Sequence, residues 1–135
     1  MRIDRVVRAD VDVLCLTCAD DVAEFPAAWE QLERAVVSLR GRRFYGAFTP
    51  GVEYRVCVEP MAGDDADALG LERWTLPGGA FARTRLRGEP PGVYALIGST
   101  FERLVAASTP DPSRPSIEHY RRRDEIDLLL PIVVP

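Results

Sequence analysis

Residues 43–59, with the sequence RFYGAFTPGVEYRVCVE, predict an antiparallel hairpin. Arg43 to Phe48 forms a short aromatic strand, and Thr49-Pro50-Gly51 supplies the residues of a turn. From Glu53 to Glu59 apolar and polar residues alternate strictly, which places the apolar side chains on one face of a second strand. Two strands joined by so short a turn are expected to pair with each other.

A strand and a helix are expected before this hairpin. Val11 to Thr17 alternates and is apolar on both faces, as in a buried strand. From Phe25 to Arg40 apolar residues recur at steps of three and four, which predicts a helix. Asp20-Asp21 could cap this helix, Pro26 fits its first turn, and Gly41 is a natural stop.

The rest of the chain repeats the same order of elements. An acidic exposed loop is expected at Ala62 to Leu69 before the repeat begins. The expected elements are a strand region over Leu71 to Arg87 broken by Pro77-Gly78-Gly79, a helix over Val93 to Ser108, a connector over Thr109 to Pro115, and strands over Ser116 to Arg121 and Glu125 to Val134.

This repetition predicts an α+β fold. Two strand-helix-strand-strand repeats would be related by a pseudo-twofold axis and would form a mostly antiparallel sheet with two helices on one face. The other face would then be free to form a ligand cleft. Residues 1–135 are few enough for a single domain with one core.

Composition excludes several classes of function. The net charge of −4 and the lack of a clustered basic face argue against direct nucleic-acid binding. All 17 basic residues are arginine, which excludes Schiff-base and P-loop lysines. Cys15-x-x-Cys18 has no partner motif for zinc, so we expect no metal and no cofactor. Few cysteines, and no secretory or membrane-spanning stretch, predict a cytoplasmic protein.

Six residue strings resemble the GyrI-like small-molecule-binding family, whose relatives include the effector domains of AraC-type and MerR-type multidrug regulators. In order, the strings are Phe44-Tyr45-Gly46, Glu53 to Val58, Leu76 to Ala82, Gly88 to Tyr94, Ile117 to Tyr120 and Ile126 to Ile132. The chain departs from the family in carrying Asp127 where relatives mostly have glutamate, and in lacking the tight His-x-Gly-Pro-Tyr form at residues 87–94.

The resemblance implies a cleft between the two halves that is lined by aromatic side chains and holds an acidic residue. Such clefts bind bulky, planar or lipophilic cations. Some members hydrolyse strained cyclopropane-containing compounds with a carboxylate and a tyrosine in the same cleft.

Glu118 and Tyr120 are the candidate catalytic pair. They lie two residues apart on an expected strand and therefore share a face. A carboxylate beside a phenol in an apolar cleft could bind a cation or act as a general base. A solvated edge strand with a polar outer face would explain the same pattern.

Four further residues are candidate ligand contacts. Asp127 interrupts an apolar strand, so it either faces the open side of the sheet or is buried and paired. Tyr45, Tyr54 and Trp74 could stack on a planar ligand, or could serve only as core residues. His119, the single histidine, is expected to be packed or exposed on the face opposite Glu118.

Three hypotheses for the function follow. The first is a stand-alone binding protein or sensor for small lipophilic compounds, including cationic ones. The second is a hydrolase that opens cyclopropane-containing compounds with the same carboxylate and a tyrosine. The third is a gyrase-inhibitor-type module that meets a protein through its open face, and a homodimer is also compatible with the sequence.

Overall fold

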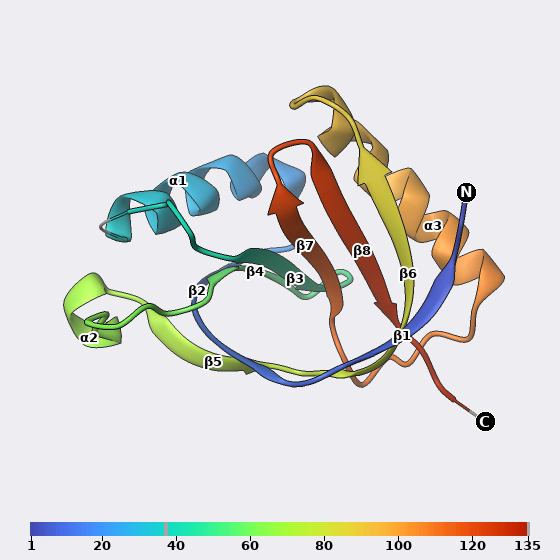
Figure 1. Cartoon of the computed structure of the whole chain (residues 1–135), viewed down its shortest axis with the longest axis horizontal. Helices are drawn as coiled ribbons and strands as arrows, with labels where there is room; N and C mark the ends of the chain where they lie inside the picture. Colours follow the sequence, from blue (N-terminus) through green and yellow to red (C-terminus); the bar gives the residue numbers. More distant parts are fainter. Residues whose placement is uncertain (37, 135) are drawn as a thin grey trace.

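The computed structural model describes residues 1–36 and 38–134, which form one eight-stranded antiparallel sheet with helices on its outside (Figure 1). The strands are β1 (Asp4–Arg8), β2 (Val11–Cys18), β3 (Phe44–Thr49), β4 (Glu53–Val58), β5 (Glu72–Leu76), β6 (Gly79–Arg87), β7 (Ser116–Arg122) and β8 (Glu125–Pro131). The helices are α1 (Phe25–Ala35), α2 (Ala66–Leu69) and α3 (Ile97–Ala107), and short 3-10 turns at Val22–Glu24 and Gly92–Leu96 lead into α1 and α3.

The two halves of the sheet repeat one another. The strand order is β1-β6-β8-β7-β3-β4-β2-β5, so from the centre outward one half runs β3, β4, β2, β5 and the other β7, β8, β6, β1. In chain order, α1 lies between β2 and the hairpin of β3 and β4, and α3 lies between β6 and the hairpin of β7 and β8. The predicted fold class, with its repeated strand-helix-strand-strand order, is therefore confirmed.

The sheet curls because two chain segments bend from one half into the other (Figure 1). Only Ala9 and Asp10 separate β1 from β2, and only Pro77 and Gly78 separate β5 from β6. The two bends lie against each other, since the amide of Gly78 donates to Asp10 Oδ1 at 2.7 Å. A Cβ at Gly78 would overlap the backbone of β1 at its bend, which explains glycine here.

The outer face of the sheet carries both long helices. Leu32 of α1 is packed with Leu14, Val56 and Val58 from β2 and β4. In the other half, α3 packs in the same way on β6 and β8 through a cluster of buried side chains: Ala82, Phe101, Leu104, Ile126, Leu128 and Leu130. Each such fully buried aliphatic side chain contributes about 1.5–3 kcal/mol.

The inner, concave face is filled by the alternate residues of the same strands. Val13, Cys15, Cys57, Phe81 and Leu129 are among the residues buried there. A strand alternates its side chains between faces, so one strand supplies both layers of core. The inner core lies between β3 and β7 on one side and the two bends on the other.

Three sequence predictions need correction. The predicted helix Phe25 to Arg40 ends at Ala35, and Val36 is already extended; position 37 of that prediction lies outside the described residues. The predicted loop Ala62 to Leu69 contains α2, whose Ala66 is buried. β1, a short strand at one edge of the sheet, was not predicted at all.

Two local predictions at the start of α1, on Asp21 and Pro26, are confirmed. Asp21 caps the first helical turn by accepting a hydrogen bond from the amide of Ala23. Pro26 occupies the first turn of α1. In the described ranges, 1–36 and 38–134, no helix is both long and apolar enough to cross a membrane.

Candidate functional site

Glu118 lies on the outer face at the centre of the sheet, where the two halves meet. Its side chain accepts hydrogen bonds from the hydroxyls of Tyr54 and Tyr120, each 2.6 Å from Oε1. Glu118 is only 5% exposed and Tyr54 only 2%. The structure thus brings together three of the residues that the sequence suggested: one carboxylate and two phenols.

Strand register and a glycine make room for this carboxylate. Glu118 on β7 is paired directly with Gly46 on β3. A Cβ at Gly46 would overlap the Tyr54 hydroxyl and would stand 2.5 Å from Glu118 Oε1. The absence of a side chain at Gly46 therefore lets Tyr54 reach across β3 to Glu118.

Aromatic side chains from both halves enclose the three residues. We call Phe25, Trp29, Phe48, Tyr94 and Phe101 the aromatic enclosure. Phe25 of α1 stacks on Tyr54 with ring centroids 3.9 Å apart, and Trp29 meets Tyr120 edge-on at 5.2 Å. Tyr94, in the turn before α3, meets Tyr120 at 6.3 Å, and Phe101 of α3 meets Phe48 at 5.1 Å.

The surroundings of Glu118 oppose its ionisation. Burial raises the pKa of this carboxyl above its ordinary value, although the Tyr120 and Tyr54 hydrogen bonds act in the opposite direction. Burial, together with the nearby carboxylate, also raises the pKa of both tyrosines, so their hydroxyls stay protonated. Within residues 1–36 and 38–134, no arginine forms an ion pair with Glu118.

The second carboxyl oxygen of Glu118 remains available. Both phenols donate to Oε1, and no donor in the described part of the chain reaches Oε2. An ionised carboxylate can thus keep its two phenol donors and still meet a ligand through Oε2.

Replacing Gly46 with alanine should destabilise the protein by about 1–3 kcal/mol, because the new methyl group must displace Tyr54 or Glu118. Urea unfolding monitored by circular dichroism measures this loss. Gly98→Ala is the matched control, since nothing lies within 4 Å of its Cβ position, and should leave stability unchanged or slightly higher. Equal stability of the two variants would show that Tyr54 and Glu118 do not need the space at Gly46.

The other predicted ligand residues lie on the inner face. Asp127 is 0% exposed and is held by Arg85, with oxygen–nitrogen distances of 2.7 and 3.2 Å. Tyr45 donates to Glu59 at 2.8 Å and stacks on His119, and the ring of Trp74 is covered by a guanidinium group at 4.5 Å. These three candidates therefore do not join Glu118.

Glu118 does not lie on the face where the sequence predicted the cleft. The sequence placed the ligand site on the face away from the helices, whereas Glu118 and its tyrosines lie on the helix-bearing face. A cavity of about 10 Å³ on the inner face, lined in part by Tyr45, is too small for an organic ligand. A larger cavity of about 340 Å³ lies beside β6 and is not lined by Glu118.

Sequence reasoning missed the aromatic enclosure. The helical periodicity of residues 25–40 marks Trp29 only as a residue of the apolar face of the helix, and it gives Phe25 no function. Their spacing of four residues on one helix was a usable signal, because such residues lie on the same side. Which strand residues they meet depends on the packing of α1 against the sheet, and the sequence does not reveal that.

The chain shares its fold with proteins of known structure. No model of a known protein family matches the sequence, and no curated protein does. An integron cassette protein from the mobile metagenome of Vibrio cholerae superposes with a TM-score of 0.80 at 11% identity, covering 97% of this chain and 95% of that one.

Two further structures are informative. The protein SAV2435, solved bound to tetraphenylphosphonium, has a TM-score of 0.70 at 11% identity, covering 98% of this chain and 94% of that one. A hydrolase from Listeria innocua has a TM-score of 0.59 at 9% identity, covering 98% and 92%. At such identities the likeness establishes the fold alone: this chain has an α+β fold that it shares with a protein solved with bound tetraphenylphosphonium.

Proposed function

We propose that this protein binds a bulky lipophilic cation at Glu118, between α1 and α3. The observation that carries the proposal is a buried carboxylate whose hydrogen-bond partners are neutral phenols. A buried negative charge without a positive partner is costly, and an organic cation would supply that partner.

The other well-buried carboxylates of the chain make the contrast clear. Asp127 is paired with Arg85, and Asp64 accepts two hydrogen bonds from Arg42 at 2.7 and 3.1 Å. The chain has 17 arginines, so guanidinium partners are abundant. Glu118 is surrounded by aromatic rings instead, as expected of a carboxylate whose counter-ion comes from outside.

The aromatic enclosure suits a lipophilic cation. Aromatic rings bury large apolar areas and attract positive charge through their faces. Tyr94 is 46% exposed, so it lies on the solvent side of the enclosure. A bulky ligand would enter by displacing Tyr94 and Trp29 from Tyr120, which couples binding to a movement of the helices.

One structural comparison and the resemblance of six residue strings support the proposal. The structure of SAV2435 has the same fold and holds tetraphenylphosphonium, a lipophilic cation. The sequence also resembles the GyrI-like family, whose clefts bind such cations.

The affinity of the protein for a ligand should depend on the positive charge of that ligand. We expect tetraphenylphosphonium to bind at least about 10-fold more tightly than triphenylphosphine oxide, a neutral molecule of similar aromatic character, because only the cation can pair with the buried carboxylate. The protein has two tryptophans, so in Trp74→Phe the fluorescence of Trp29 reports directly on the enclosure. Equal affinities for the charged and the neutral compound would exclude Glu118 as a cation receptor.

Hydrolysis is a second candidate function for the same residues. A carboxylate that can deprotonate water, next to a phenol that can donate to a developing oxyanion, has the parts of an acid–base site. One structure of this fold is a hydrolase, which also supports the idea. Catalytic ring opening of a cyclopropane-bearing compound, lost in Glu118→Gln, would establish this activity, and stoichiometric protection of the compound would favour binding alone.

A further inference from the structure

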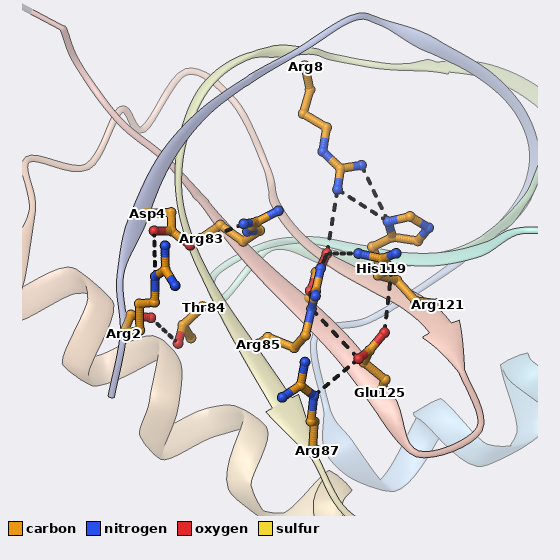
Figure 2. A network of polar contacts seen from close by, with 11 residues as sticks. Arg2, Asp4, Arg8, Arg83, Thr84, Arg85, Arg87, His119, Arg121 and Glu125 are labelled. Atoms are coloured by element: carbon orange, nitrogen blue, oxygen red, sulfur yellow. Dashed lines mark hydrogen bonds and ion pairs between the residues drawn. The ribbon is translucent and has the colours of Figure 1, made fainter.

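A second, chemically opposite surface lies at the end of β6 (Figure 2). A cavity of about 340 Å³ is lined by four arginines and only one acidic residue. Its lining consists of Met1, Arg2, Asp4, Arg83, Thr84, Arg85 and Arg87. The volume is within the range of small-molecule sites.

Strand geometry creates this cavity. β6 runs from Gly79 to Arg87, but its pairing with β1 stops at Asp4 and Arg83. Residues 84–87 of β6 therefore have no neighbouring strand on that side. Arg83, Arg85 and Arg87 alternate along β6, so their side chains point to the same face.

The arginines around this cavity exceed the carboxylates available to them. Arg2 and Arg83 share Asp4, at 3.0 and 3.1 Å. Glu125 and Asp127 are shared by Arg8, Arg85, Arg87 and Arg121. Six arginines thus meet three carboxylates, which leaves an excess of three positive charges in this ion-pair network of a chain whose net charge is −4, and four of the six arginines line the cavity.

The behaviour of the neighbouring histidine agrees with a positive surface. His119 is contacted by two nitrogens of Arg8, each at 3.3 Å from Nδ1, as Figure 2 shows. Burial and then the charge of Arg8 lower the pKa of His119 to about 4, although Asp127 acts in the opposite direction. The imidazole is therefore neutral at physiological pH, and it adds no charge to that of the arginines and their carboxylate partners.

We propose that this cavity binds a small polyvalent anion, such as a phosphate-bearing or polycarboxylate molecule. Guanidinium groups bind phosphate and carboxylate oxygens in a bidentate manner, and Arg83 and Arg87 can add such contacts beside the carboxylates they already hold. Arg85 mainly holds Asp127 and is a positioning residue. The site lies on the inner side of β6, so it is independent of the cation site at Glu118.

Calorimetric titration with pyrophosphate and, separately, with citrate tests this proposal. We expect saturable binding of at least one of the two anions, at least about 5-fold weaker in Arg83→Gln and in Arg87→Gln, because each variant removes one guanidinium group from the cavity. Arg103→Gln, an exposed arginine of α3, is the control and should bind as the wild type does. Pyrophosphate alone would indicate a phosphate ligand, and citrate alone a polycarboxylate.

Failure of this proposal is distinguishable from failure of the cation site. Tetraphenylphosphonium affinity should be the same in wild type, Arg83→Gln and Arg87→Gln. If neither anion saturates the wild type, or if Arg103→Gln weakens binding as much as the cavity variants do, the cavity is not an anion site and its arginines serve only the ion-pair network.

Discussion

Replacing Glu118 with glutamine should weaken tetraphenylphosphonium binding by about 30-fold or more, because removing one partner of a buried charge pair costs about 2–5 kcal/mol. The same substitution should leave the free energy of unfolding unchanged or raise it. Burial raises the pKa of Glu118, so ionising this residue in the folded protein works against folding, and glutamine carries no such charge. Fluorescence titration and urea unfolding of the same variant measure both effects.

Glu102→Gln provides the control for this experiment. Glu102 is an exposed carboxylate on α3, so its loss should alter affinity by little more than a surface charge does. If Glu118→Gln binds tetraphenylphosphonium as tightly as Glu102→Gln, the carboxylate is not the receptor. A large loss of stability in Glu118→Gln would instead mark Glu118 as a structural residue.

Asp127→Asn should have the opposite profile, losing about 2–4 kcal/mol of folding free energy while retaining cation affinity. Asp127 is fully buried, and its loss leaves Arg85 without its bidentate partner and Arg8 and Arg121 without a shared counter-charge. We expect a smaller loss of stability than for a fully buried ion pair, because the Arg85 side chain is 28% exposed and solvent screens its charge. Urea unfolding and tetraphenylphosphonium titration of the folded variant check the two expectations.

Asp124→Asn, in the exposed turn between β7 and β8, is the matched control and should change stability by no more than about 0.5 kcal/mol. A small effect of Asp127→Asn would mean that its ion pairs add little net stability. Loss of cation binding in the folded Asp127→Asn variant would show that Asp127 contributes to the ligand site, as the sequence suggested.

The repeated fold could be predicted from sequence because its signals are local. The hairpin of residues 43–59 carries its own alternation and turn residues, and both long helices carry their own periodicity. β1 was missed because this five-residue strand at the sheet edge, with the sequence DRVVR, has little apolar content and no alternation of charged and apolar residues. Its pairing with β6 joins residues nearly eighty positions apart, which no local pattern reveals.

The arrangement of the candidate site was predicted in part, for a similar reason. Alternation correctly placed Glu118 and Tyr120 on one face, since this follows from strand geometry. Tyr45 and Tyr54 could not be sorted between the faces, because sorting them requires the register between β3 and β4. The choice of face also depended on where the helices pack, and the helices cover the side that holds Glu118.

The pH dependence of cation binding tests the central claim most directly. Tetraphenylphosphonium should be titrated by calorimetry from about pH 4 to about pH 8, in buffers that differ in ionisation enthalpy, with wild type and Glu118→Gln. Because Glu118 must be ionised to pair with a cation and its pKa is raised, wild-type affinity should fall as the pH decreases through that pKa, and binding there should release a proton. Glu118→Gln should bind weakly, with little pH dependence and no proton release linked to position 118. Identical pH profiles and proton release in the two proteins would contradict a buried carboxylate as the cation receptor.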